Sequence, residues 1–221
     1  GVLGYGFDAY RVYPLNAMGG SLPFFQPANQ RLSVPDNVNG TLKAAGVNLQ
    51  NYYNTFSGCT AGVGGALIDC RGANSAEEFE RQWPKTVAGI LATGADIIGL
   101  VELENDGYDP ESAIQDLVNR LNAAAGVGTF AFIDVDTATG QVNALGTDAI
   151  RVGLIYRPGR VTPVGTTAVL NTVEFVNGGD ASPRNRPALA QTFEEVANKA
   201  RLVVSVNHLK SKSSACDLPD Q

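Results

Sequence analysis

The chain has 221 residues, of which 44% are hydrophobic and 17% charged, so it can form one globular domain with a sizeable core and lacks the composition of a disordered protein. Its formal net charge of −6 argues against a protein that coats nucleic acid through a basic surface, although an enzyme can meet phosphate locally through a metal and a few arginines. No apolar stretch approaches the length of a bilayer-spanning helix.

The hydrophobic pattern predicts an α/β domain preceded by a small module. Residues 1–40 hold an alternating, aromatic stretch and then several prolines and glycines, which indicates the end of a small β-module followed by a linker. From residue 41 onward, strands alternate with helices, and the short connections favour a mixed sheet in which 149–156 and 161–169 could form a hairpin. We expect strands at 42–49, 97–101, 130–135, 149–156, 161–169, 189–193 and 201–208, and helices at 75–93 and 109–125.

The helix predicted at 75–93 has a clear start and one internal conflict. Ser75 and Glu78 have the spacing of a capping box. Pro84 lies inside the helical pattern, so we expect a break or kink near Trp83.

Three cysteines, Cys59, Cys70 and Cys216, bear on the compartment of the protein. The first two bracket a glycine-rich loop of about ten residues, which a disulfide closes readily. We therefore expect a Cys59–Cys70 bridge and an oxidising compartment. Cys216 is then left over, which suggests that the natural chain continues beyond Gln221. No CxxC motif or cysteine–histidine cluster supports a zinc site.

One predicted strand ends in a group of acidic residues. The apolar run Ile97–Val101 leads directly into Glu102, Glu104, Asn105 and Asp106. Ligands of α/β proteins bind at the carboxyl ends of strands, and carboxylates there suit a hard cation. Strand periodicity places Glu102 and Glu104 on one face. The alternative is a strand that runs into a solvated acidic turn.

The single histidine, His208, ends the predicted strand 201–208 and precedes a small basic loop with Lys210 and Lys212. An imidazole beside two ammonium groups suits an anionic ligand. A structural or merely exposed histidine is the alternative. A serine hydrolase would need a G-x-S-x-G elbow, which the sequence lacks.

Two arginines and an asparagine also lie beside predicted strands. Arg184 and Arg186 precede strand 189–193, and their guanidinium groups match phosphate oxygens, although they could equally solvate a loop. Asn48 lies at the end of the first core strand, where its amide could bind phosphate or cap a turn. With Glu102 and His208 these groups form the set that metal-assisted phosphoryl transfer needs.

Several stretches, in order over residues 41–221, resemble motifs of the endonuclease/exonuclease/phosphatase family, the fold of DNase I, and most closely its branch of bacterial secreted nucleases. The stretches that carry the resemblance are 42–52 with Asn48, 70–82, 99–105 with Glu102, 150–158, 184–189 with Arg186, and 204–212 with His208.

The resemblance implies a four-layer α/β sandwich and a nuclease site. Glu102 would hold Mg²⁺, or Ca²⁺ or Mn²⁺, and Asn48 would help to orient the metal or the phosphate. His208 would hydrogen-bond or protonate at the scissile phosphate of DNA or RNA. Glu104 and Asn105 become supporting residues. The branch also implies a secreted, extracellular or periplasmic bacterial protein.

The resemblance assigns phosphate contacts to basic residues. Arg186 matches the arginine that holds a non-bridging oxygen, and Arg184 is its neighbour in the same motif. Lys210 and Lys212 would touch the substrate backbone. Two alternatives stay open: a phosphatase or phosphodiesterase of the same fold that acts on a small or lipid phosphate, and a non-catalytic binding module of a secreted protein.

The resemblance is incomplete. A later Asp-x-Asn motif and a C-terminal Asp-His pair of the family are missing from the chain. We therefore expect 41–221 to be the N-terminal portion of the family domain, without turnover of its own. We also expect it to supply mainly one sheet, whose bare inner face would favour self-association.

Overall fold

The computed structural model of the chain describes residues 2–6, 8–13 and 39–211. The chain divides into two compact units, Gly1–Gly40 and Thr41–Gln221. In the first unit, β1 (Val2–Gly6) and β2 (Ala9–Tyr13) pair as an antiparallel hairpin. The rings of Tyr5 and Tyr10 contact each other across it in a tilted arrangement, with their centroids 4.9 Å apart. The predicted linker lies largely outside the described residues.

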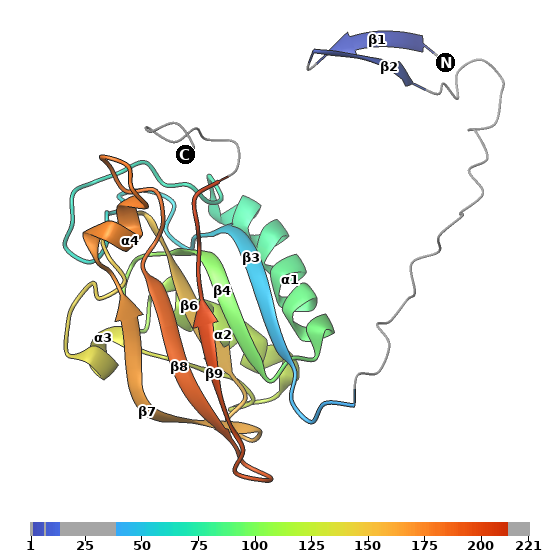
Figure 1. The fold of residues 1–221 in the computed structure, drawn as a ribbon. Coiled ribbons are helices and arrows are strands. Elements are labelled where there is room, and N and C mark those ends of the chain that lie inside the picture. The colour runs from blue at the N-terminus through green and yellow to red at the C-terminus, as the bar shows by residue number, and fades with distance from the viewer. Residues whose placement is uncertain (1, 7, 14–38, 212–221) are drawn as a thin grey trace, which may run out of the picture. The chain divides into compact units, whose positions relative to one another are not determined.

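The second unit is a layered α/β structure with two sheets (Figure 1). Its elements, in chain order, are β3 (Ala44–Tyr52), α1 (Ala76–Thr93), β4 (Ile97–Glu104), α2 (Ala113–Ala125), β5 (Ala131–Phe132), α3 (Val135–Thr139), β6 (Ile150–Tyr156), β7 (Val161–Leu170), α4 (Val173–Asn177), β8 (Ala188–Glu195) and β9 (Arg201–Val206). The first sheet has the order β3-β4-β6-β5 and is mixed, because β3 and β4 run parallel while the other neighbours are antiparallel. The second sheet, β7-β8-β9, is antiparallel. The predicted α/β class and mixed sheet are confirmed.

Helices α1 and α2 cover one face of the first sheet (Figure 1). The core between them contains Ile98 and Leu100 from β4 and apolar side chains from both helices, among them Ile90 and Leu117. The period-two pattern of β4 sends its other residues, such as Ile97, to the opposite face, where they meet the second sheet.

The second sheet overturns one expectation. We predicted mainly one sheet with a bare inner face, but β8 and β9 pack over β4 and β6 through a core that includes Val152, Leu154, Leu189 and Phe193. The approach is close at Gly99, where a Cβ atom would lie 2.8 Å from Cγ2 of Val206. Because the second sheet covers that inner face, a bare apolar face is no longer a reason to expect self-association, which stays a prediction.

Local sequence explains most element boundaries. Oγ of Ser75 accepts a hydrogen bond from the Glu78 amide, and Gly94 ends α1 in the left-handed conformation. The break expected near Trp83 is wrong, because α1 continues through Pro84. Proline removes one helical hydrogen bond, and the buried stripe of α1 holds the helix together across that gap.

Two further expectations need correction, and one short helix was not predicted. The strand predicted at 130–135 is reduced to the two residues of β5, because Asp134 caps α3 by accepting from the Thr137 amide. The short helix α4 carries too few residues to show a helical period. The hairpin of 149–156 with 161–169 does not form, because β7 leaves the first sheet and pairs with β8. None of the helices in the described ranges is long and apolar enough to cross a membrane.

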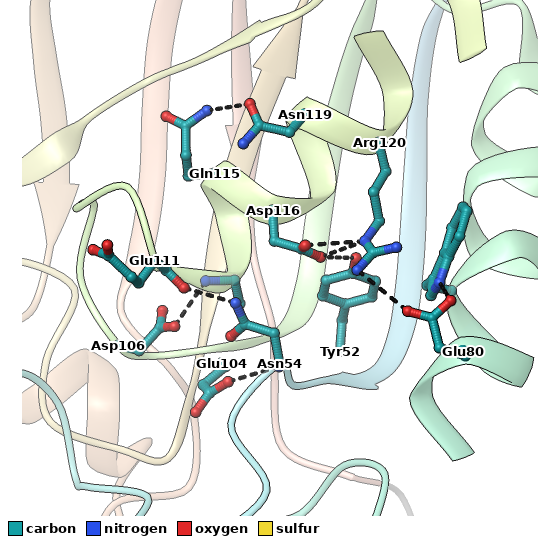
Figure 2. Close-up of polar contacts among 12 residues, drawn as sticks. Tyr52, Asn54, Glu80, Glu104, Asp106, Glu111, Gln115, Asp116, Asn119 and Arg120 are labelled. Carbon is teal, nitrogen blue, oxygen red and sulfur yellow. Dashed lines mark hydrogen bonds and ion pairs between the residues drawn. The ribbon is translucent and has the colours of Figure 1, made fainter. Parts of the chain in front are cut away.

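A polar cluster ties the end of β3 to both helices (Figure 2). Tyr52 donates its hydroxyl hydrogen to Asp116 at 2.6 Å, and Arg120 forms an ion pair with the same carboxylate at 2.8 Å. The Arg120 guanidinium also stacks 4.2 Å from the centroid of the Trp83 ring. These contacts fix the strand end that leads into the candidate site.

Candidate functional site

The candidate site lies where β3 and β4 lose their regular pairing. The register of β3 with β4 shifts between Asn48 and Tyr52, and that of β4 with β6 shifts between Leu100 and Leu103. Glu102, inside the second irregularity, has φ of 62°. A non-glycine residue in this left-handed region costs about 1–2 kcal/mol, and bulges of this kind redirect side chains next to functional sites. The regular alternation that was predicted to place Glu102 and Glu104 on one face is therefore interrupted at Glu102.

Glu102, Asn48 and His208 meet at this bulge. Nδ2 of Asn48 donates to Oε1 of Glu102 at 2.8 Å, and Nε2 of His208 lies 3.7 Å from the same oxygen. Oδ1 of Asn48 accepts from the backbone N–H of Gln50 at 2.7 Å, which fixes the amide with its NH₂ group toward Glu102. Three residues from three different strand ends thus form one polar centre.

The imidazole of His208 is largely shielded from solvent. Burial lowers its pKa from the ordinary value, and the nearby Arg186 lowers it further, while Glu102 and Asp148 oppose the shift. Nδ1 of His208 is buried and has no hydrogen-bond partner among the described residues. The imidazole is therefore biased toward its neutral form, with one nitrogen left for a further partner.

Arg186 joins this centre through the backbone and through Asp148. Its N–H donates to the carbonyl of His208 at 3.0 Å, and its Nε forms an ion pair with Oδ2 of Asp148 at 2.8 Å. The other oxygen of Asp148 lies 3.7 Å from Nη1 of Arg71. The sequence analysis missed Asp148 and Arg71. The available signals were a carboxylate just before a buried strand and an arginine directly after a bridged cysteine.

The remaining basic residues from the sequence analysis have other contacts. Arg184 forms an ion pair with Asp180 at 2.6 Å. Lys210 donates its backbone N–H to Oδ1 of Asn185 and its ammonium hydrogen to the carbonyl of Ser211. Lys212 lies outside the described residues. Their assignment to the substrate backbone stays a prediction.

The Cys59–Cys70 disulfide is present, as predicted, with the two Cα atoms 5.3 Å apart. Beside it Glu104, 4% exposed, accepts from the backbone amide of Asn54 at 3.0 Å (Figure 2) and from that of Thr55 at 3.3 Å. Burial and the neighbouring Asp106 raise the pKa of Glu104 to about 7. Glu104 thus anchors the loop that follows β3, whereas Glu102 faces Asn48 and His208.

Asn105 has a supporting position next to these carboxylates. Its Nδ2 donates to the carbonyls of Gly146 and Asp148, both at 2.9 Å. These two bonds hold the loop before β6 against the end of β4, and so they hold Asp148 beside Arg186.

The donor set fits a hydrated divalent ion more closely than a fully protein-bound one. In the described part of the chain, no three histidine, cysteine, aspartate or glutamate side chains gather to hold a metal. Mg²⁺ typically keeps several waters and uses one or two carboxylates, so a site with Glu102 as its one protein carboxylate is compatible with this ion. The contacts of Asn48 with Glu102 and with the Gln50 amide orient the Glu102 carboxylate, and the assignment of Asn48 as a metal ligand stays a prediction.

Comparison with known proteins gives distant structural likenesses. No family model and no curated protein matches the chain. A Bacteroides thetaiotaomicron protein of the endonuclease/exonuclease/phosphatase family is 12% identical, with a TM-score of 0.45 over 76% of this chain and 50% of that one. The mannosyl-6-phosphatase of the same organism is also 12% identical, with a TM-score of 0.42 over 75% and 50% of the two chains.

A third structure, an endonuclease/exonuclease/phosphatase protein from Beutenbergia cavernae, is 21% identical, with a TM-score of 0.40 over 78% of this chain and 39% of that one. The chain thus spans half or less of the length of these structures. Two of the three carry the name of the family whose motifs the sequence resembles.

Proposed function

We propose that the protein to which this chain belongs hydrolyses phosphodiester bonds of nucleic acid with a divalent metal ion, and that the centre around Glu102 binds the ion and the scissile phosphate. The observation that carries the proposal is the meeting of a carboxylate, an imidazole and an orienting amide at one bulge, beside a guanidinium group. A metal ligand, a proton-transfer group and a phosphate-binding cation are the parts that such hydrolysis needs.

Each residue has a role that follows from its contacts. The ion, Mg²⁺ or else Ca²⁺ or Mn²⁺, would polarise a phosphoryl oxygen and offset negative charge in the transition state. Glu102 would hold it, with Asn48 fixing the carboxylate at 2.8 Å. Arg186 would bind a non-bridging oxygen by sharing its guanidinium between Asp148 and the phosphate.

His208 would act on the scissile phosphate itself. Its lowered pKa favours the neutral imidazole, which can take a proton from the attacking water or donate its N–H to a phosphate oxygen. The Cys59–Cys70 disulfide supports a secreted, extracellular or periplasmic location, since disulfides persist in oxidising compartments.

Metal binding by this chain is the first test. Mn²⁺ titrated calorimetrically into the wild-type chain should bind, and Glu102→Gln should weaken that binding at least tenfold, because it removes the anionic ligand. Glu174→Gln is the matched control, since it removes one negative charge from an exposed position on α4. Equal Mn²⁺ affinity in the wild type and Glu102→Gln would reject Glu102 as the ligand.

Substrate class is tested in the whole protein to which this chain belongs. Cleavage of plasmid DNA or RNA in Mg²⁺, lost in EDTA and in Glu102→Gln, is the expected result. Hydrolysis of p-nitrophenyl phosphate without nucleic-acid cleavage would show that the protein is a phosphatase and not a nuclease. Retention of function in Glu102→Gln would point instead to a non-catalytic binding module.

A further inference from the structure

Arg71 is an arginine at the edge of the candidate site that the proposed mechanism does not use. Its Nη1 lies 3.7 Å from Oδ1 of Asp148, while Nε of Arg186 lies 2.8 Å from Oδ2 of the same side chain. Two guanidinium groups therefore flank one carboxylate, which leaves one net positive charge in this group of three. An anion that reaches both arginines would complete the charge balance.

The backbone around Arg71 is fixed on both sides. Cys70 before it is bridged to Cys59, which is 2% exposed. Gly72 after it packs so closely on Tyr53 that a Cβ atom would lie 2.4 Å from the Tyr53 Cβ. The Tyr53 hydroxyl in turn donates to the carbonyl of Ala149, the residue after Asp148, at 2.7 Å. The position of Arg71 relative to Asp148 thus follows from covalent and packing constraints.

The side chain of Arg71 retains donors for a ligand. It is 45% exposed, and within the described residues its guanidinium forms the ion pair with Asp148 but no hydrogen bond. A guanidinium group has five N–H donors in a planar fork that matches phosphate oxygens. The 3.7 Å separation from Asp148 is longer than a direct hydrogen bond, so binding of a phosphate would not require that a short bond be broken.

We propose that Arg71 binds a second phosphate of the substrate strand, adjacent to the phosphate held at Arg186 and His208. This inference rests on the proposed function and narrows it. The preferred ligand is a polynucleotide, in which successive phosphates of one strand can reach both arginines, rather than a mononucleotide or a small phosphate ester. Because Cys70 positions Arg71, the second phosphate site depends on the Cys59–Cys70 disulfide.

Binding in EDTA tests the inference without any need for turnover. The anisotropy of a short fluorescent single-stranded oligonucleotide, titrated with the chain over a range of salt concentrations, gives the affinity and its salt slope. Each lost phosphate contact reduces that slope by about 0.7 for a single strand. We expect Arg71→Gln to reduce the slope by this amount and to weaken binding about fivefold, as for one exposed charged contact.

Two controls separate a specific contact from a general loss of charge. Arg201→Gln removes the same charge from an exposed, ion-paired arginine at the start of β9, the opposite end of that strand from His208, and should leave the slope unchanged. Thymidine 5′-monophosphate, with its single phosphate, should compete equally well against the wild type and Arg71→Gln. In a Cys59→Ser/Cys70→Ser background, Arg71→Gln should have a smaller effect, which a double-mutant cycle measures.

The outcomes distinguish this inference from the proposed function. If Arg186→Gln weakens oligonucleotide binding but Arg71→Gln does not, the second phosphate site is wrong and the proposed function stands. If neither substitution changes binding, the phosphate site at Arg186 is wrong as well. If Arg71→Gln also lowers the affinity for the mononucleotide, Arg71 serves the first phosphate and the inferred preference for a polynucleotide fails.

Discussion

A methyl group added at Gly99 should push the two sheets apart at a point where they approach closely. Gly99 lies in β4, and a Cβ atom there would stand 2.8 Å from Cγ2 and 3.4 Å from Cγ1 of Val206 in β9. Ordinary carbon–carbon contacts begin near 3.5 Å, so β9 must move by several tenths of an ångström or Val206 must leave its preferred rotamer.

The cost of Gly99→Ala follows from this contact. Overpacking of a close-packed core by one methyl group typically costs 1–3 kcal/mol, and Val206 is only 7% exposed. We expect Gly99→Ala to reduce the free energy of unfolding by about 2 kcal/mol and to lower Tm by roughly 4–8 °C. His208 follows Val206 by two residues, so the polar centre should also be disturbed.

Urea and thermal unfolding, followed by far-UV circular dichroism and by the fluorescence of the single tryptophan, measure the effect. Gly89→Ala is the matched control, because a Cβ atom at Gly89 in α1 meets nothing within 4 Å. It should stabilise the protein by about 0.5–1 kcal/mol through helix propensity.

The second substitution Val206→Ala removes the methyl groups that the new Cβ would strike. The double variant Gly99→Ala/Val206→Ala should therefore be more stable than the sum of the two single effects predicts, with a coupling energy of about 1 kcal/mol or more. Strict additivity of the two substitutions, or a Gly99→Ala variant as stable as the wild type, would show that the sheets do not pack as described.

Four other expectations concern pH, redox state, the histidine and assembly. Burial raises the pKa of Asp106 from 3.8 to about 6. Between pH 4 and 6 the unfolded state therefore loses a proton that the folded state keeps, so the free energy of unfolding falls as pH rises, by about 1–2 kcal/mol after allowance for solvent screening. Urea unfolding of Asp106→Asn should lack this decrease. Loss of the bridge in Cys59→Ser/Cys70→Ser should cost about 3 kcal/mol in urea unfolding, and an unchanged midpoint would mean that the bridge closes no flexible loop. Because the chain has a single histidine, its NMR titration follows one resonance, and Arg186→Gln should raise the pKa of His208; a lower value would contradict the proximity of the two groups. Within the described ranges β3 and β9 are edge strands that border an open groove of about 420 Å³, so light scattering at micromolar concentration should detect self-association, and a monodisperse monomer would contradict it.

Sequence periodicity predicts the fold class well because most of its elements are long. The apolar runs of β4 and β6 and the stripe of α1 follow directly from period-two and period-3.6 patterns. The local hydrophobic pattern does not reveal that β7, β8 and β9 form a sheet of their own. That separation depends on long-range packing, such as the contact of Gly99 with Val206, which no local pattern encodes.

The candidate site likewise has features that the sequence predicts and features that it does not. Asn48 and Glu102 lie in the carboxyl-terminal halves of two neighbouring parallel strands, so their proximity could be expected from the order of the elements. The bulges could not, since Glu102 takes φ of 62° without glycine or any other turn residue to signal it. Asp148 and Arg71 meet only because a disulfide and a tightly packed glycine hold a loop in place.

The left-handed conformation of Glu102 has a consequence for any selection based on stability. Glycine at this position would relieve backbone strain of about 1–2 kcal/mol, less the entropy that glycine adds to the unfolded chain. A library of variants sorted by resistance to heat or protease alone should therefore enrich substitutions at position 102 that abolish ion binding. The residue essential for the proposed chemistry would then emerge from a screen that never measures it, as a position where the native side chain is not the most stable choice.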